Sequence, residues 1–150
     1  MTTVVKARQE KSPEEEAFLD LLRTADALTR GADWVLKAED LSQTQYNVLR
    51  ILRGAPEGLS CGEIASRMIT RDPDITRLLD RMEKRGLISR ARESKDRRLV
   101  LTRLTPEGLK LVNCLDEPVL QIHRKQLGHM GKDRLQALAK LLAAARSGLS

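Results

Sequence analysis

Two neighbouring arginines, Arg97 and Arg98, follow Asp96 at a predicted tight turn in the segment 93-ESKDRRLVLTRLTPEG-108. An alternating run of apolar and polar residues comes after the turn, so the segment predicts a β-hairpin with the arginines at its tip. Guanidinium groups at a hairpin tip add nothing to a hydrophobic core, but they bind phosphate oxygens and base edges. The alternative is a charged tip that only keeps the protein soluble.

A second polar group lies upstream, where Asp72 and Pro73 are expected to open a helix as its N-cap and its first helical residue. Arg77 can donate two hydrogen bonds to guanine O6 and N7, and Thr76 can contact a thymine methyl group. Asp74 could accept a hydrogen bond from a cytosine amino group. Together with Pro73, these side chains predict a surface that reads bases in the major groove. An ordinary solvated helix arginine is the alternative for Arg77.

The chain carries a formal net charge of +6, and this excess is local. Residues 67–103 contain twelve Lys and Arg and six Asp and Glu, whereas the rest of the chain contains fifteen of each class. A basic excess confined to one segment is typical of a nucleic-acid-binding surface. A solvated charged face is the alternative, and it explains a scattered excess better than a local one.

No pattern in the sequence indicates catalysis, a metal site or a cofactor. His123 and His129 are six residues apart, which does not match the spacing of metal ligands on one helix face. Cys61 and Cys114 lie far apart without a motif, so they predict reduced thiols in the cytoplasm. The chain has neither a signal-peptide pattern nor an apolar run of bilayer length, so no membrane association is expected.

Helical periodicity, capping residues and alternating segments predict the elements that hold these groups. Ser42 with Gln45, and Ser60 with Glu63, have the spacing of capping boxes, and Gly86 is expected to be a left-handed C-cap. Pro118 inside a helix predicts a kink or a short break. Three helices followed by the hairpin describe a winged helix-turn-helix, with 69-ITR-71 as its turn, so the fold class is mainly α with a small β-hairpin wing. The expected order is a helix over 13–37, a helix from Ser42 to the stop at 54-GAPEG-58, a helix from Ser60 through Met68, a helix from Asp72 to Gly86, strands over 87–93 and 97–104, a helix from Thr105, and a last helix from about Lys132.

The run 64-IASRMITRDPDITRLLDRMEKRGLISRARESKDRRLVLTRLTPEG-108 resembles the MarR (multiple antibiotic resistance regulator) family of winged helix-turn-helix transcription regulators. The segment 82-MEKRGLI-88 is similar to the end of the family's recognition helix, and 41-LSQTQYNVLRIL-52 to its second helix. The resemblance covers roughly residues 15–145. The family's wing pattern, Asp-x-Arg followed after six residues by Thr-x-x-Gly, is matched by Asp96, Arg98, Thr105 and Gly108.

The resemblance implies that Arg98 enters the minor groove, where narrow A·T-rich DNA has an enhanced negative potential. Asp96 is then expected to restrain the wing tip by pairing with Arg98 or Arg92, and Arg97 to contact a phosphate or the groove. Four basic residues flank this surface and are candidate phosphate contacts, although each could be a solvated charge: Arg71, Arg81, Arg90 and Lys95.

A homodimer is implied as well, because apolar stripes on the first and the last two helices exceed what one small core covers. Residues 1–12 are expected to be a loose tail and 13–150 a single domain. Within it, 41–105 would form the winged helix-turn-helix, and 13–37 and 106–148 the dimerisation helices. Packing within one chain is the alternative for the last helix. A twofold dimer would bind a pseudo-palindromic operator with half-sites about 34 Å apart.

Some members of the family bind small aromatic or phenolic anions between the dimer helices and the DNA-binding lobe, and then release DNA. Trp34 and Tyr46 are candidates to border such an effector pocket, and simple core packing is the alternative. The sequence therefore predicts a cytoplasmic transcription regulator that binds double-stranded DNA. A repressor is favoured over an activator, and an enzyme is not expected. The alternatives are a winged-helix module for protein interaction or non-specific nucleic-acid binding, and a metabolite sensor that does not bind DNA.

Overall fold

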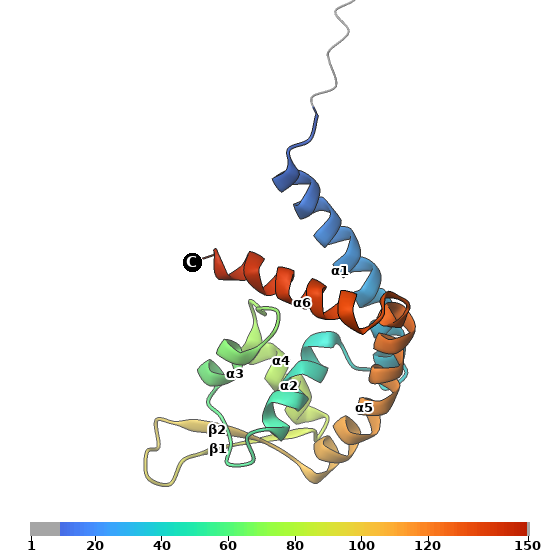
Figure 1. Cartoon of the computed structure of the whole chain (residues 1–150). Coiled ribbons are helices and arrows are strands. Elements are labelled where there is room, and N and C mark those ends of the chain that lie inside the picture. The colour runs from blue at the N-terminus through green and yellow to red at the C-terminus, as the bar shows by residue number, and fades with distance from the viewer. Residues whose placement is uncertain (1–9, 150) are drawn as a thin grey trace, which may run out of the picture.

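The computed structural model describes residues 10–149, which form six α-helices, one short 3-10 helix and one antiparallel pair of strands (Figure 1). The mainly helical fold with a small hairpin is therefore confirmed. Most of the predicted tail, residues 1–9, lies outside the described residues. The elements are α1 (Pro13–Lys37), α2 (Gln43–Arg53), α3 (Cys61–Arg67), α4 (Ile75–Lys84), β1 (Ile88–Arg92), β2 (Val100–Leu104), α5 (Pro106–Leu127), η1 (Gly128–Met130) and α6 (Lys132–Ser147).

Four helices begin where polar capping residues predict their start. Ser12 accepts a hydrogen bond from the N–H of Glu15 at 3.2 Å, and Pro13 follows as the first helical residue of α1. Ser42 and Ser60 form complete capping boxes at the starts of α2 and α3. Each serine accepts from the N–H three residues on, and the side chain there accepts in return. Thr105 caps α5 through its hydroxyl oxygen alone, which accepts the N–H of Gly108.

The start of α4 differs from the prediction, which placed the N-cap at Asp72 and helical conformation at Pro73. The N-cap is Asp74, whose Oδ1 accepts the N–H of Arg77 at 3.2 Å, and the helix begins at Ile75. Asp72 Oδ1 instead accepts the N–H of Asp74 at 2.8 Å. Aspartate side chains favour such local turns as strongly as helix caps, so the first of the two aspartates forms a turn and the second caps the helix.

The wing has shorter strands and a longer tip than the sequence predicts. Strands β1 and β2 pair antiparallel, with Ile88 opposite Leu104 and Arg92 opposite Val100. The tip therefore spans residues 93–99, whereas a turn of three residues around Lys95 was expected. A hydrogen bond from Glu93 N–H to Leu99 O, at 2.8 Å, closes this loop.

Helix α5 runs without interruption from Pro106 to Leu127 and contains Pro118. The proline is exposed, while Leu115 and Val119 on either side of it are buried. A proline inside an isolated helix costs about 3 kcal/mol, so packing of the buried side holds this helix together. Of the kink or short break predicted at Pro118, the short break is therefore absent.

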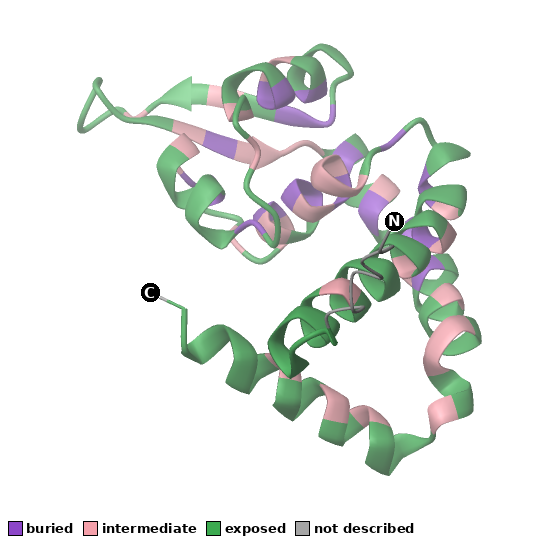
Figure 2. Cartoon of the chain, turned by 90° about the horizontal axis from the view of Figure 1, so that it is seen from above, coloured by how far each residue is buried: buried purple, intermediate pink, exposed green. Residues whose placement is uncertain are grey.

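The buried core lies between α2, α3, α4, the base of the wing and the inner faces of α1 and α5, while α6 contributes no buried residue (Figure 2). Phe18, Leu21 and Leu22 near the start of α1 are exposed, as is Leu141 on α6. The apolar faces of these two helices are thus uncovered in a single chain. No helix within residues 10–149 combines the length and the apolar composition needed to cross a bilayer.

The junction between β2 and α5 packs against the turn that follows α4, and this contact explains why Thr105 and Gly108 occur together. Thr105 Oγ1 donates to the carbonyl oxygen of Gly86 at 2.5 Å and accepts the N–H of Gly108 at 3.1 Å. A Cβ on Gly108 would lie 2.1 Å from the carbonyl oxygen of Leu87. Gly86 itself has φ +75°, which confirms the predicted left-handed C-cap.

We expect Gly108→Ala to lower the free energy of unfolding by about 1–3 kcal/mol, because the added methyl group meets backbone that cannot move aside. Gly62→Ala is the matched control, since a Cβ there, also near a helix start, meets nothing within 4 Å. That variant should be neutral or more stable, because alanine favours helix over glycine. Urea denaturation measures both changes, and equal stability of the two variants would contradict the close approach at Gly108.

Candidate nucleic-acid interface

Helices α3 and α4 form the helix-turn-helix unit, and residues 68–74 connect them. This connection is longer than the predicted turn 69–71, because α4 starts later than expected. One face of α4 is buried in the core, through Leu78, Leu79 and Met82. The outward side of the helix start carries the four residues predicted to read bases, all of them exposed: Pro73, Asp74, Thr76 and Arg77.

Asp74 has the structural role that the sequence assigned to Asp72. Its Oδ1 caps α4, and its Oδ2 lies 3.2 Å from Nε of Arg77. Both carboxylate oxygens thus interact within the chain and orient Arg77, while the Asp74 side chain stays 54% exposed. The Arg77 side chain is 70% exposed, and no other interaction engages its guanidinium within residues 10–149. Its two terminal amino groups match the paired acceptors of guanine.

The wing tip carries Arg97 and Arg98 on an exposed loop. Asp96 restrains this loop through the backbone, because its Oδ1 accepts the N–H of Arg98 at 3.0 Å. The ion pair expected between Asp96 and either Arg98 or Arg92 is absent from the described part of the chain. Nη1 of Arg92 donates instead to the carbonyl oxygen of Arg97 at 2.7 Å. The side chains of Arg97 and Arg98 remain available for a ligand.

Arg90, one of the candidate phosphate contacts, is engaged within the protein. Its Nη2 lies 2.5 Å from Asp80 Oδ1 and 3.1 Å from Glu83 Oε1, and only 23% of the side chain is exposed. Its backbone N–H also donates to Glu83, at 3.1 Å. The hydrogen bonds from Arg90 hold the pKa of Glu83 below its usual value. Arg90 therefore fixes β1 to α4, and the guanidinium is not free to bind a phosphate.

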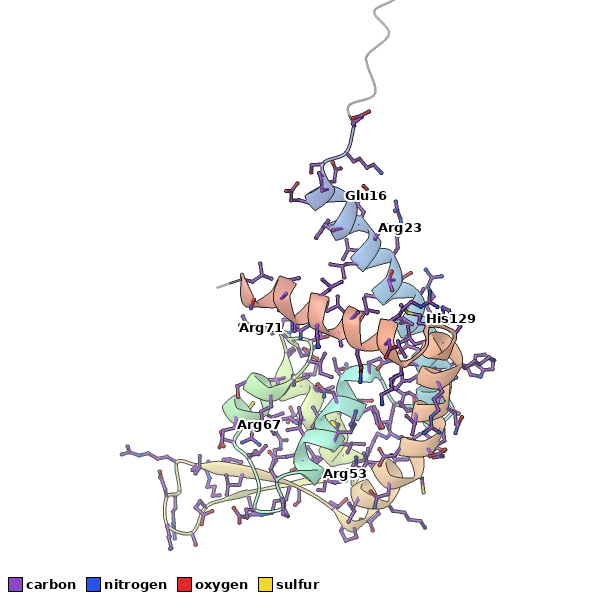
Figure 3. All side chains as sticks on the ribbon, viewed as in Figure 1. Glu16, Arg23, Arg53, Arg67, Arg71 and His129 are labelled. Carbon is purple, nitrogen blue, oxygen red and sulfur yellow. The ribbon has the colours of Figure 1, made fainter. Side chains whose placement is uncertain are left out.

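The remaining phosphate candidates, Arg71, Arg81 and Lys95, are exposed. Arg67, at the end of α3, is exposed as well and was missed as a candidate. Figure 3 shows Arg67 and Arg71 toward the side of the molecule to which the wing extends. The local excess of charge over residues 67–103 was the available signal for Arg67, since that segment begins there.

Arg85 links the end of α4 to the end of α1, a contact that the sequence did not indicate. Its Nη1 donates to the carbonyl oxygen of Asp40 at 2.6 Å, and its Nη2 to that of Glu39 at 3.0 Å. Carbonyl groups just past a helix C-terminus lack helical partners, and Asp40 has φ +52°, so this turn depends on an outside donor. No local pattern relates two positions 45 residues apart.

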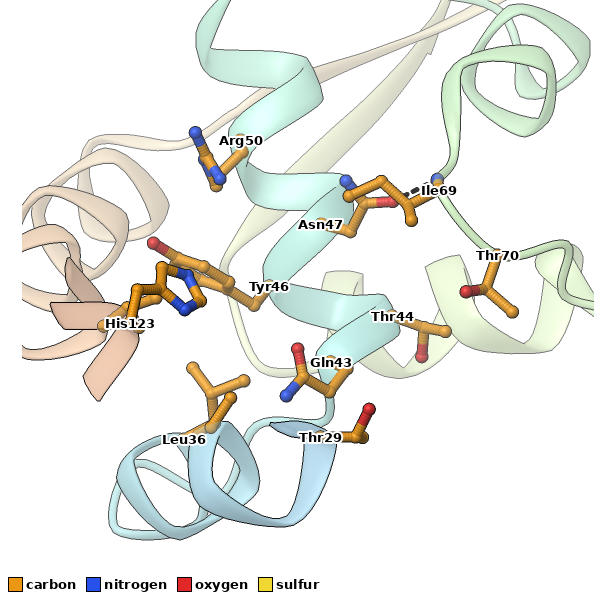
Figure 4. Close-up of a pocket in the computed structure, with 12 residues that line it drawn as sticks. Thr29, Leu36, Gln43, Thr44, Tyr46, Asn47, Arg50, Ile69, Thr70 and His123 are labelled. Carbon is orange, nitrogen blue, oxygen red and sulfur yellow. Dashed lines mark hydrogen bonds between the residues drawn. The ribbon is translucent and has the colours of Figure 1, made fainter. Parts of the chain in front are cut away.

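A cavity of about 280 Å³ lies between α1, α2, α5 and the connection from α3 to α4 (Figure 4). Tyr46 lines the cavity, but Trp34 does not, because Ala32 and Leu36 occupy the inward face of α1. Trp34 is 80% exposed on the outer face of that helix, so it does not border this cavity. The polar residues that line the cavity are Thr29, Gln43, Thr44, Asn47, Arg50, Thr70 and His123.

Tyr46 is fixed at this cavity by charged neighbours. Its O–H donates to Asp116 Oδ1 at 3.1 Å, and Arg53 forms an ion pair with the same carboxylate. Burial, strengthened by the hydrogen bond to Asp116, raises the pKa of Tyr46, so the phenol stays neutral. The guanidinium of Arg50 lies 5.9 Å from the centre of the Tyr46 ring and forms no ion pair within residues 10–149. A free cation beside neutral donors suits a small anion.

Comparison with known proteins agrees with this arrangement. A sequence model described as the MarR family matches residues 41–100. The HTH-type transcriptional regulator PecS of Dickeya dadantii (strain 3937) is 31% identical over 124 residues, which cover 81% of this chain and 75% of that protein.

Solved structures resemble the chain over nearly its whole length. A MarR transcription factor from Planctomyces limnophilus is 42% identical with a TM-score of 0.69, over 91% of this chain and 99% of that one. A mutant of E. coli MarR, in complex with operator DNA, is 23% identical with a TM-score of 0.76, over 83% and 89% of the two chains. Bordetella bronchiseptica BpsR, whose DNA binding is regulated by 6-hydroxynicotinic acid, is 22% identical with a TM-score of 0.81, over 91% and 96%. The last two show a common fold.

We expect Arg90→Met to lower the free energy of unfolding by roughly 1 kcal/mol at pH 7, the scale of a partly exposed ion-pair network. The pKa of Glu83 is depressed in the folded state, so its contribution is present above the usual value of 4.5 and is lost as the pH falls through the lowered pKa. The difference in the free energy of unfolding between Arg90→Met and the wild type should therefore shrink below pH 4.5. Arg81→Met is the control, and urea denaturation across this pH range measures both. A pH-independent difference would show that packing of the Arg90 stem is responsible.

Proposed function

Since the chain belongs to the MarR family of DNA-binding transcription regulators, we propose that it is a repressor that occupies a pseudo-palindromic operator as a homodimer in the cytoplasm. One observation carries the proposal: the exposed start of α4 and the arginines of the wing tip belong to a single unit joined by Arg90. A recognition helix and a wing held in fixed relation can enter neighbouring grooves of one duplex. Its role is binding, and no residue is assigned a catalytic part.

Base reading is assigned to the start of α4. Arg77 would contact guanine O6 and N7 with its two terminal amino groups, while Asp74 holds its Nε. Thr76 and Pro73 are exposed next to it and would contact thymine methyl groups. Asp74 thus contributes to specificity by orienting Arg77.

The wing and the basic flank are assigned to the DNA backbone and the minor groove. Arg98 would enter the groove, and a narrow A·T-rich groove would favour it by its enhanced negative potential. Arg97 would contact an adjacent phosphate. Phosphate contacts supply affinity and position the protein without reading sequence. Four further exposed basic residues support this role: Arg67, Arg71, Arg81 and Lys95.

Dimerisation is assigned to α1, α5 and α6, within the single domain 13–150. Phe18 and Leu22, both more than half exposed on α1, and Leu141, 69% exposed on α6, form apolar faces without cover in one chain. Burying such faces in a second copy removes about 25 cal/mol of unfavourable free energy per Å² of apolar surface. The winged helix-turn-helix 41–105 would then be presented twice, related by a twofold axis.

The cavity beside Tyr46 is assigned to a small aromatic carboxylate that releases DNA. Arg50 would pair with the carboxylate, while His123 and the threonines would orient the ring substituents. Asn47 Oδ1 accepts the N–H of Ile69 at 2.9 Å, so the cavity wall is bonded to the connection that leads into α4 (Figure 4). A ligand that binds more tightly when this connection shifts would lower the affinity for DNA. By linkage, the DNA-binding free energy lost on ligand binding equals the ligand-binding free energy lost on DNA binding.

Arg77→Ala should weaken binding to an operator duplex by about 1–3 kcal/mol and relax base preference at one position per half-site, because a bidentate contact is lost. The operator duplex is obtained by selection from a random-sequence library with the wild-type protein. Fluorescence anisotropy on this duplex and on a scrambled one, at two salt concentrations, measures the change. Arg124→Ala, which removes an exposed arginine of α5, is the matched control and should bind as the wild type does.

Three results would contradict parts of the proposal. An equal loss on both duplexes would make Arg77 a phosphate contact. Equal binding of both duplexes by the wild type would favour a winged-helix module that binds nucleic acid without specificity. Absence of binding to either duplex at low salt would favour a module for protein interaction.

Arg50→Ala should abolish release of the operator by 6-hydroxynicotinate or benzoate while leaving DNA affinity without these compounds unchanged. The reason is that Arg50 lines the cavity and forms no ion pair within residues 10–149, and it belongs to α2 rather than to α3 or α4. The measurement is displacement of labelled operator at increasing concentrations of each compound. A wild-type protein that responds to neither carboxylate would overturn the ligand class, and an undiminished response of the variant would overturn the role of Arg50.

A further inference from the structure

We propose that Arg92 is a positioning residue for the minor-groove arginine of the wing. Together with Asp96, it holds the peptide unit between Arg97 and Arg98 in a fixed plane, so that the Cα atoms that carry both side chains are held in place before DNA arrives. The inference rests on the proposed function of Arg98, and it assigns Arg92 an action through the wing backbone, without a DNA contact of its own.

This assignment rests on two side-chain hydrogen bonds to the same peptide unit. The carbonyl oxygen of Arg97 accepts from Nη1 of Arg92 at 2.7 Å. The N–H of Arg98, which belongs to the same planar unit, donates to Oδ1 of Asp96 at 3.0 Å. A peptide unit is rigid, so fixing its oxygen from one side and its nitrogen from the other fixes its plane. The Cα–Cβ bonds of Arg97 and Arg98 leave from the two ends of that plane.

The loop at the wing tip has few other interactions that could order it. The tip spans residues 93–99, and its other backbone hydrogen bonds are Glu93 N–H to Leu99 O at 2.8 Å and Leu99 N–H to Asp96 O at 3.1 Å. Every residue from Ser94 to Leu99 is exposed, so packing cannot order this segment. Ordering a loop only on binding reduces affinity, by about 0.5–1.5 kcal/mol for each side chain immobilised.

Arg92 is suited to the task by its place and its shape. It is the last residue of β1 and pairs with Val100, so its backbone is fixed by the sheet while its side chain reaches five residues along the chain. A guanidinium beside two other arginines is electrostatically unfavourable, since like charges repel. An arginine at position 92 therefore needs a favourable contact that offsets this repulsion. The hydrogen bond to the Arg97 carbonyl oxygen is such a contact.

A double-mutant cycle between Arg92 and Arg98 distinguishes positioning from a direct phosphate contact. The variants are Arg92→Ala, Arg98→Ala and the double variant, and Arg67→Ala serves as a control with an independent arginine. The probe is the operator duplex selected with the wild-type protein, with anisotropy measured over a range of salt concentrations. Arg92 should matter only while Arg98 is present.

We expect Arg92→Ala to weaken operator binding by about three- to tenfold in the wild-type background, the scale of lost preorganisation. In the Arg98→Ala background the same substitution should change affinity less than about twofold, with an unchanged salt slope. If Arg92→Ala instead weakens binding by the same factor in both backgrounds, and each arginine removed lowers the salt slope by about one, Arg92 contacts a phosphate. That result would overturn the proposal. Arg67→Ala, the control, should weaken operator binding by the same factor whether or not Arg98 is present.

Backbone dynamics of the free protein provide a readout that does not depend on DNA. In ¹⁵N relaxation experiments, Arg92→Ala should increase the fast motion of the Arg97 and Arg98 amides, and Arg92→Lys, which keeps one donor, should restore part of the order. Unchanged order in Arg92→Ala would overturn the positioning role even if DNA binding falls. If the wild type binds no duplex specifically, the proposed function fails, and the relaxation experiment still decides whether Arg92 orders the wing.

Discussion

The ion pairs of Arg90 with Asp80 and Glu83 set the relation between the two parts of the molecule that face DNA. The recognition helix and the wing come from separate segments, and each would reach a groove only at a defined angle to the other. A two-stranded hairpin is marginally stable on its own, so its direction must be fixed from its base. Arg90 is the middle residue of β1, two residues beyond Ile88, and bonds α4 through both its side chain and its N–H.

A second contact continues this unit toward the rest of the fold. The Thr105 hydroxyl bridges Gly86 and Gly108, so the end of α4, the start of β1 and the start of α5 meet at one point. Only glycine fits at position 108, because the carbonyl oxygen of Leu87 occupies the space of a Cβ. The pattern Thr-x-x-Gly thus reflects backbone packing between α5 and the wing. Any rotation of α5 within a dimer would therefore move the base of the wing directly.

Local chemistry in the sequence was sufficient for most of the fold, and it failed where distant residues compete. Serine capping boxes and the glycine at position 86 were assigned correctly because their partners lie within three residues. The start of α4 was misplaced because two aspartates share the same capping chemistry. Arg90 was grouped with surface arginines because its partners on α4 lie up to ten residues away and are recognised only when the hairpin folds back. Trp34 does not line the cavity, and this was not foreseen because helical periodicity does not show which face of α1 meets α5.

The cavity and the proposed base-reading residues meet at the connection from α3 to α4. Ile69 and Thr70 line the cavity beside Tyr46, while Asp74, four residues later, caps the recognition helix and holds Arg77. The connection has no helical hydrogen bonds of its own over most of its length, and Asn47 is the side chain that ties it to α2. A ligand in the cavity would therefore act on the least constrained segment next to the reading residues. Because α4 itself is buried along one face and bonded to the wing, a shift of this segment would move helix and wing together, and both groove contacts would be lost at once.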